Sequence, residues 1–328
     1  MSNKSYAVFI DDEYYYDFVA LYNSWKYYGN TIPIKVYSYF NLSEDKKIAI
    51  KKHCELIEDT NPGYDMSAFR SKQMFKYYAL SRHMNEYEMI LDADMLFLNN
   101  NDHLLDYAEE GLVVGSSENI GELIYKISSG VKKPSQWPYL VTRTQQLLNP
   151  HIGEKSKRYT ESLSQKILNG GFLGFSKKKH MPLIKKVIDV MSDKKIPNIN
   201  IPFDNEQSVV NLLIKLMGLE YKDLPANQWM NTWWNHSKPK KIIKVEDQEM
   251  RVYDEEGYRL NMYHFTGGIG MPHPSQELTG DGLAACRNKA WFGSCGFFGK
   301  DELEELWFKK KECPVFMLFV YFASKGLS

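Results

Sequence analysis

The chain has 328 residues, with 41 Lys and Arg against 41 Asp and Glu, and a formal net charge of zero. This balance argues against general nucleic-acid binding, which needs an excess of basic side chains to replace counterions. Hydrophobic residues make up 43% of the chain and aromatic residues 14%, which argues against disorder and fits one large domain or two modest ones.

The first residues and the cysteines bear on the cellular compartment. The start of the chain carries no charged-then-apolar signal pattern, so we expect an unexported, cytoplasmic protein. The four cysteines are too few and too scattered for a disulfide framework or a zinc site, and we expect reduced thiols.

The first 120 residues alternate between strand and helix patterns. Residues 6–10 are an apolar run that predicts a buried strand, which ends in the acids Asp11, Asp12 and Glu13. Helical spacing of apolar residues follows over 18–25 and again over 74–79. Further strands are predicted over 32–39, 89–91 and 112–114. This alternation is typical of a parallel sheet with helices on both faces, where ligands bind beyond the carboxyl ends of the strands.

The rest of the chain shows fewer clear patterns. Residues 116–165 are polar, and we expect helices and loops over the cleft. A glycine-rich strand or turn is predicted over 168–175, and amphipathic helices over 183–191 and 209–217. From residue 301 we expect a charged helix and then the apolar run 315–323, which is shorter than the ~20 residues that a membrane-spanning helix needs.

The clearest motif is the segment 89–98, Met-Ile-Leu-Asp-Ala-Asp-Met-Leu-Phe-Leu. Asp92 and Asp94 lie between apolar segments, where a carboxylate is costly unless a cation or hydrogen bonds offset its desolvation. Carboxylates suit Mg²⁺ or Mn²⁺, and such an ion can hold a pyrophosphate and neutralise the charge of a diphosphate leaving group. A strand end followed by a solvent-facing turn would explain the same residues without a metal.

An Asp-x-Asp motif at a strand end, in a chain of this length, resembles the GT-A glycosyltransferases. The closer resemblance is to family 8, the group of glycogenin and the bacterial lipooligosaccharide galactosyltransferases, and it covers residues 6–272 in islands. It implies an α/β fold, Rossmann-like, with a mixed, mainly parallel sheet flanked by helices and a helical C-terminal extension. It also implies a UDP-sugar donor, Mn²⁺ or Mg²⁺ as cofactor, and retention of the anomeric configuration.

The resemblance assigns nucleotide contacts to the end of the first strand. By position, Asp11 would accept a hydrogen bond from the uracil and Tyr14 would stack on its ring. Glu13 stands where the family has Asn at the ribose. Asp92 would contribute to donor binding as well as to the metal.

The resemblance assigns the diphosphate to one further position and a donor-sugar hydroxyl to another. Lys76, on the helix before Asp92, would face the diphosphate, with Arg70 and Lys72 as rivals. Glu118 would bind a hydroxyl of the donor sugar with a longer arm than the family's Asp. An acid that simply follows a strand is an equally good explanation of Glu118.

Two small clusters lie where the family places its reacting sugar. In the segment 168–175, Asn169 and Gly170 would bind the donor sugar, since a small residue lets the backbone approach and Asn offers both donor and acceptor. Glu206 and Gln207 occupy the family's Asp-Gln position at a helix start. They are the catalytic candidates, as nucleophile or polarising group, although an acid at a helix N-terminus is also favoured by the helix dipole.

The segment 262–268 supplies the third expected metal ligand. His264 takes the position of the family's His, and imidazole is a suitable partner to Asp92 and Asp94 around a borderline metal. The family continues to a Lys that touches the diphosphate, whereas this chain has Gly-Met-Pro-His over 270–273. The phosphate contacts must therefore differ from the family's. Three tryptophans could stack on an acceptor sugar or lie in the core: Trp229, Trp233 and Trp234.

Together these patterns predict a single GT-A domain over 1–270 and a C-terminal extension over 271–328. Within the domain, 1–120 would bind the nucleotide and 121–270 the donor sugar and acceptor. The expected function is metal-dependent transfer of a sugar from a UDP-sugar to a glycan or glycolipid acceptor. The alternatives are a sugar nucleotidyltransferase, against which the absence of glycine over 11–16 counts, and a non-catalytic glycan-binding or scaffold protein.

The tail permits two interpretations. Lys309, Lys310 and Lys311 precede the apolar run 315–323, a combination that could rest on an anionic membrane surface where lipid-linked acceptors occur. A C-terminal helix that closes the core or forms a dimer contact explains the tail equally well.

Overall fold

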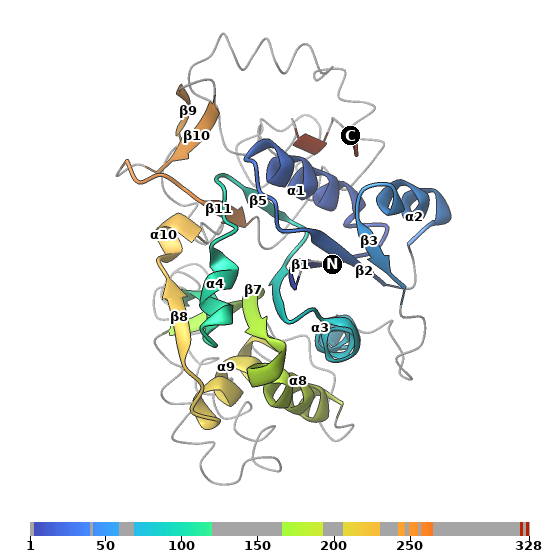
Figure 1. Cartoon of the computed structure of the whole chain (residues 1–328), viewed down its shortest axis with the longest axis vertical. Helices are drawn as coiled ribbons and strands as arrows, with labels where there is room; N and C mark the ends of the chain where they lie inside the picture. Colours follow the sequence, from blue (N-terminus) through green and yellow to red (C-terminus); the bar gives the residue numbers. More distant parts are fainter. Residues whose placement is uncertain are drawn as a thin grey trace, which may run out of the picture. The chain divides into compact units, whose positions relative to one another are not determined.

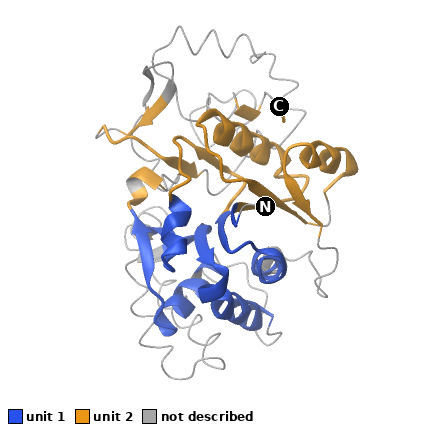
Figure 2. Ribbon diagram, in the orientation of Figure 1, with its two compact units in different colours: residues 1–5, 59–90, 104–224 blue, residues 6–58, 91–103, 225–328 orange. Residues whose placement is uncertain are grey.

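The structure is a computed structural model, and it describes residues 3–39, 42–58, 69–119, 166–192, 206–229, 242–246, 249–254, 257–264, 322–323 and 326–327 (Figure 1). The chain divides into two units, each built from segments distant in sequence (Figure 2). Unit 1 comprises residues 1–5, 59–90 and 104–224, and unit 2 comprises residues 6–58, 91–103 and 225–328.

Unit 2 contains most of β1 (Lys4–Ile10), then α1 (Tyr15–Tyr27), β2 (Ile34–Ser38), α2 (Glu44–Lys51) and β3 (Glu55–Ile57). The three strands pair in parallel, with Tyr6 opposite Ile34 and Lys35 opposite Glu55. β1 is buried from Ser5 onward, as its apolar run predicts. The sequence does not predict α2, because Ile50 is its one buried residue and the helix has no apolar stripe.

The remaining elements of unit 2 are β5 (Met95–Phe97), α10 (Ala226–Trp229), β9 (Ile242–Glu246), β10 (Glu249–Tyr253) and β11 (Met262–His264). β9 and β10 form an antiparallel pair, as do β5 and β11. Within the core of this unit α1 packs against β5, where the Phe97 backbone N–H donates a hydrogen bond of 3.0 Å to Ser24 Oγ. The Phe97 ring meets Tyr6 edge-on at a centroid distance of 5.3 Å.

Unit 1 contains α3 (Phe69–His83), β4 (Tyr87–Leu91), α4 (Leu104–Glu109), β6 (Val113–Asn119), β7 (Lys166–Ser176), α8 (Lys177–Met191), α9 (Glu206–Leu216) and β8 (Tyr221–Leu224). β6 pairs antiparallel with β7 and parallel with β8. The glycine-rich segment 168–175 is a strand, and the two amphipathic patterns are α8 and α9. No sequence pattern predicts α4 or β8, which are short.

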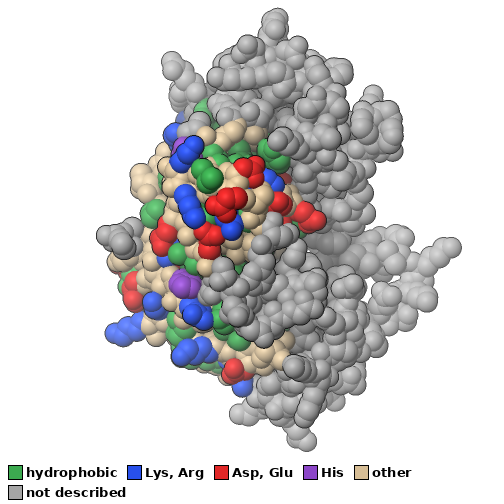
Figure 3. Space-filling view, turned by 90° about the vertical axis from the view of Figure 1, so that its right-hand side faces the viewer, with side chains coloured by type: hydrophobic (Ala, Val, Ile, Leu, Met, Phe, Trp, Pro, Cys, Tyr) green, Lys and Arg blue, Asp and Glu red, His purple; other side chains and the backbone are tan. Residues whose placement is uncertain are grey.

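Seven strands form one sheet in the order β3-β2-β1-β4-β7-β6-β8, and helices flank it. The predicted mixed, mainly parallel α/β class is therefore confirmed. Acidic and basic side chains lie among one another on the face shown in Figure 3, consistent with the zero net charge. None of the helices that the structure describes has the length and apolar character needed to cross a membrane.

Several predictions fall on residues outside the described part of the chain. Residues 116–119 extend β6, but most of the predicted loop-and-helix region 116–165 is not described. The same holds for the charged helix and most of the apolar run in the tail. The boundaries predicted at 120 and 270 stay predictions.

Candidate functional site

The turn between β4 and β5 carries both acids of the Asp-Ala-Asp motif. β4 ends at Leu91 and β5 begins at Met95, and both of these residues are fully buried. The side chain of Asp94 is 11% exposed and that of Asp92 is 29% exposed. Asp94 is thus largely withdrawn from water, while Asp92 keeps contact with solvent.

β11 brings a histidine from far along the chain to this turn. β11 runs antiparallel to β5, with His264 opposite Met95, the residue that follows Asp94. His264 Nε2 lies 3.1 Å from Asp94 Oδ1 and 3.5 Å from Asp92 Oδ2. The imidazole is 3% exposed. The three side chains form one partly buried acid–histidine cluster within unit 2.

The cluster has the chemistry of a divalent-metal site. One ligand atom from each of the three residues lies within 4.8 Å of the others, close enough for the three to hold one ion. A small divalent ion binds protein ligands at about 2.0–2.2 Å, which keeps neighbouring ligand atoms roughly 3–4 Å apart. Both distances from His264 Nε2 lie in that range. Two carboxylates and one imidazole make a mixed set that suits Mn²⁺, although an imidazolium between two carboxylates gives the same contacts.

Asp11 and Tyr14, the predicted nucleotide contacts, lie in the loop between β1 and α1. Asp11 is fully buried, and its Oδ1 accepts hydrogen bonds from the backbone N–H groups of Glu13 at 3.0 Å and Tyr14 at 3.2 Å. Asp11 therefore stabilises the tight turn between β1 and α1. Tyr14 is half-buried and Glu13 is exposed.

Asp12 anchors the same loop, a role that the sequence analysis does not predict. Its Oδ1 accepts hydrogen bonds from the backbone N–H of Ser43 at 2.8 Å and from Ser43 Oγ at 3.0 Å, and it lies 3.1 Å from Lys46 Nζ. Burial opposes ionisation of Asp12, but the bonds from Ser43 and Lys46 outweigh it and lower the pKa of this carboxyl. The loop after β1 is thereby tied to the start of α2.

Unit 1 brings together the predicted diphosphate and catalytic residues. Lys76 Nζ, on α3, lies 3.7 Å from Glu206 Oε1, on α9, and the two side chains are 11% and 6% exposed. Lys76 is therefore largely withdrawn from solvent, unlike a typical surface lysine. The side chains of its rivals, Arg70 and Lys72, lie outside the described part of α3.

β7 and α9 meet at the predicted donor-sugar residues. The backbone N–H of Gly170 donates a hydrogen bond of 3.2 Å to Gln207 Oε1, and Asn169 Oδ1 accepts one of 2.8 Å from the Gly171 N–H. A Cβ atom at Gly170 would lie 3.2 Å from Gln207 Cβ and from Glu206 Oε1. The close approach explains why glycine stands here, and it makes the four predicted residues one packed cluster.

Asn211 completes this cluster and is absent from the sequence prediction. One helical turn after Gln207, its Oδ1 accepts a hydrogen bond from the Leu168 N–H at 2.8 Å, and its Nδ2 donates to the Leu168 carbonyl at 2.8 Å. The side chain amide thus holds β7 just before Asn169. The signal available in the sequence is a polar amide inside the apolar run 209–214 of α9.

Two other predicted positions are only partly described. Glu118 lies in β6 opposite Ile167, and its side chain is outside the described part. Trp229 is 6% exposed, and its ring meets His103 at a centroid distance of 5.7 Å, which fits a core residue. Trp233 and Trp234 lie outside the described residues.

One solved glycosyltransferase structure shares the fold of this chain. The galactosyltransferase LgtC, solved in complex with donor and acceptor sugar analogs, is 15% identical, with 93% of this chain and 100% of that chain covered and a TM-score of 0.52. The chain has a glycosyltransferase fold. The predicted GT-A fold is therefore confirmed.

A second structure of the same kind is less similar. It is the apo structure of the bifunctional glycosyltransferase WbbM, 12% identical, with 82% of this chain covered and a TM-score of 0.49. This chain spans 46% of the length of WbbM. No protein-family model and no curated protein sequence matches the chain.

Proposed function

We propose that this protein is a divalent-metal-dependent glycosyltransferase that moves a sugar from a UDP-sugar to a glycan or glycolipid acceptor, with retention of the anomeric configuration. The observation that carries the proposal is the meeting of Asp92, Asp94 and His264 at the end of β4, in a chain with a glycosyltransferase fold. Carboxyl ends of strands are where α/β sheets bind their ligands.

In this proposal the residues of unit 2 hold the nucleotide end of the donor. Asp92, Asp94 and His264 hold Mn²⁺ or Mg²⁺, which when bound offsets negative charge on the departing diphosphate. Asp11 accepts a hydrogen bond from the base, and Tyr14 stacks on its ring. The hydrogen bond from the Tyr14 backbone N–H to Asp11 supports the assignment, because it fixes the backbone of Tyr14 relative to the buried carboxylate.

The residues of unit 1 would act at the sugar. Asn169 and the backbone of Gly170 bind donor-sugar hydroxyls, with Glu118 as a further contact. Glu206 and Gln207 face the reacting carbon as nucleophile or polarising group. Lys76 offsets the cost of burying the Glu206 carboxylate. Its proposed ligand is the diphosphate. The packing of Gly170 against Glu206 and Gln207 supports a shared role, because a rigid cluster can hold reacting groups in a productive orientation.

Thermal unfolding with UDP, with and without Mn²⁺, tests the proposal, and EDTA serves as the metal-free control. A ligand at about 100 times its dissociation constant adds about 2.7 kcal/mol to the free energy of unfolding, which raises Tm by several degrees. We expect a UDP-induced shift that needs Mn²⁺. The next step is to measure the hydrolysis of a panel of UDP-sugars and to determine the anomeric configuration of the product.

Matched histidine variants separate the metal site from general effects. His264→Ala should abolish the Mn²⁺-dependent part of the shift. His53→Ala removes an exposed imidazole of the same unit and should leave the shift intact. A Tm shift with a different nucleotide, and none with UDP, would mean that the donor is not a UDP-sugar. A product of inverted anomeric configuration would overturn the proposed retention. No shift with any nucleotide or metal would overturn the function.

A further inference from the structure

The position of His264 depends on a very short strand pair. β5 and β11 share three residue pairs, from Met95 opposite His264 to Phe97 opposite Met262. The two strands are far apart in the chain, so no tight turn sets their register. A slip by one residue would turn His264 to the opposite face of the pair, away from Asp94. Since two short strands alone are marginally stable, other contacts must define this register.

Asparagine side chains bind the residue that precedes β11. The carbonyl oxygen of Asn261 accepts hydrogen bonds from the Leu98 backbone N–H and from Asn101 Nδ2, both at 2.9 Å. Asn99 Nδ2 donates a third bond of 2.9 Å to Asn261 Oδ1. The loop after β5 is therefore hydrogen-bonded to the residue just before β11, three residues from His264.

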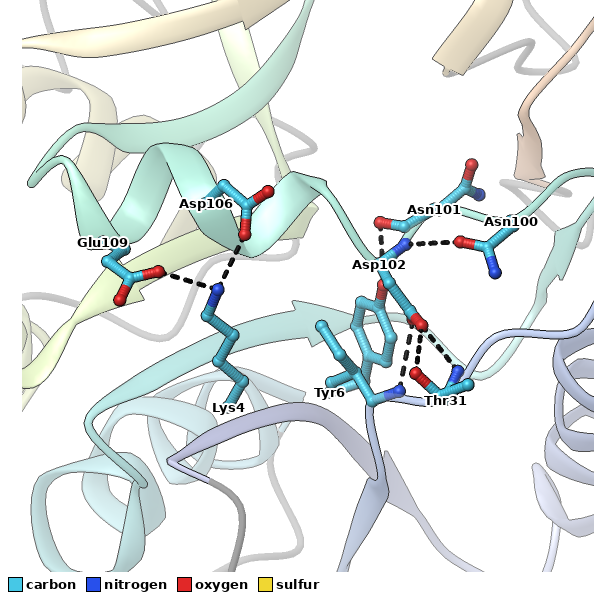
Figure 4. A network of polar contacts seen from close by, with 9 residues as sticks. Lys4, Tyr6, Thr31, Asn100, Asn101, Asp102, Asp106 and Glu109 are labelled. Atoms are coloured by element: carbon cyan, nitrogen blue, oxygen red, sulfur yellow. Dashed lines mark hydrogen bonds and ion pairs between the residues drawn. The ribbon is translucent and has the colours of Figure 1, made fainter.

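Asn101 is itself anchored to the core of unit 2. It is fully buried, and its backbone N–H donates a hydrogen bond of 2.7 Å to Asn30 Oδ1. Its carbonyl oxygen accepts one of 3.0 Å from the hydroxyl of Tyr6 on β1 (Figure 4). Asn30 Nδ2 in turn donates to the carbonyl of Asn99 at 3.1 Å. Through Asn101, the hydrogen bonds to Asn261 are thus connected to the buried strand β1.

We propose that Asn101 is a positioning residue of the metal site: its amide sets the register of β11 against β5 and so holds His264 beside Asp92 and Asp94. The inference rests on the proposed function, because it takes these three residues to bind a divalent ion. Residues that orient metal ligands typically change metal affinity by about 10- to 100-fold when they are replaced. Asn101 acts at a distance, through the strand that carries the ligand.

Asn101→Asp tests this role with almost no change of shape. The substitution removes the N–H donor and points a carboxylate at the carbonyl oxygen of Asn261. Asn100→Asp is the matched control, because it adds the same charge one residue earlier, in an exposed side chain. The Asn100 side chain bonds the Gly29 carbonyl and the Asp102 N–H instead, and Figure 4 shows the bond with Asp102. Mn²⁺ titrated into each protein with UDP present, followed by the EPR signal of free Mn²⁺, gives the affinities.

We expect Asn101→Asp to weaken Mn²⁺ binding about 10-fold or more, and Asn100→Asp to change it by less than about twofold. At saturating Mn²⁺, kcat should recover in Asn101→Asp while the KM for Mn²⁺ stays high. In the His264→Ala background, Asn101→Asp should have no further effect on Mn²⁺ affinity, because the ligand through which it acts is gone. Losses that add up in the double variant would contradict a role through His264.

The outcomes distinguish this inference from the proposed function. Wild-type protein that binds no Mn²⁺ would overturn both, so Mn²⁺ binding to the wild-type protein is measured first. Wild-type protein that binds Mn²⁺, with a folded Asn101→Asp that binds it equally well, would overturn the inference alone. If Asn101→Asp does not fold, Asn99→Leu removes the half-buried bond to Asn261 Oδ1 and should weaken Mn²⁺ binding in the same direction. Unchanged affinity there would refute the inference.

Discussion

Gly170 offers a sensitive test of the cluster in unit 1. In Gly170→Ala the new Cβ would lie 3.2 Å from Gln207 Cβ and from Glu206 Oε1, and 3.5 Å from Gln207 Cα. Gln207 Cβ is attached directly to the helix backbone, so it cannot turn away as a flexible side-chain end would. The first turn of α9 must therefore move from β7 by a few tenths of an ångström. That movement also lengthens the 3.2 Å hydrogen bond from Gly170 to Gln207 Oε1.

Gly174 is a matched control on the same strand. A Cβ at Gly174 would lie 3.1 Å from Val114 Cβ and 3.4 Å from Val114 Cγ2, so it is equally crowded but meets core residues. Overpacking of this kind costs about 1–3 kcal/mol, and the loss of glycine flexibility in the unfolded chain is the same for both. We expect both alanine variants to lower Tm by a similar few degrees.

Donor turnover should separate the two variants. Misplacing a reacting group by ~1 Å can cost about 100-fold in rate, so a shift of a few tenths at Glu206 and Gln207 should lower kcat by roughly 10-fold in Gly170→Ala. Gly174→Ala should keep the wild-type kcat. The assay is hydrolysis of the UDP-sugar identified in the panel, with Tm measured on the same samples. Equal kcat in the two variants, at equal loss of Tm, would refute the placement of Gly170 at the reacting sugar.

Three further predictions concern single side chains. Asn211→Ala removes both bonds to the Leu168 backbone and should lower kcat, while the affinity for UDP with Mn²⁺ stays unchanged. The control Leu212→Ala, a buried position on the same helix, should lower stability alone. Steady-state kinetics measure kcat, and calorimetric titration measures the affinity. Burial lowers the pKa of His180 to about 4, below its unfolded value of 6.5, so stability should fall as pH drops from about 6.5 towards 4. His180→Gln should flatten that part of the stability profile, and an unchanged acid slope would contradict it. Burial raises the pKa of the Cys54 thiol to about 12, so Cys54 should alkylate at pH 8 only on unfolding, as peptide mass mapping would show.

Local patterns account for the elements that were predicted correctly. The apolar run of β1 and the helical spacing of α8 and α9 reflect contacts that each residue makes with the adjoining layer, and these repeat with the period of the element. The Asp92–Asp94 pair stands out for the same reason, because two acids between buried apolar segments break an otherwise regular pattern. α2 lacks any such pattern, since a single buried residue, Ile50, defines no stripe.

The sequence by itself determined the two acids at a strand end and the alternation of strands and helices around them. His264 lies 170 residues from Asp94 along the chain, and only resemblance to a family predicted it as a metal ligand. Tertiary structure decided that His264 lies beside the acids, since Asn101 and its neighbours hold β11 against β5. The physical reason is that periodicity records which face of an element is buried, whereas register between distant strands depends on specific hydrogen bonds, and these leave no repeating pattern in the chain.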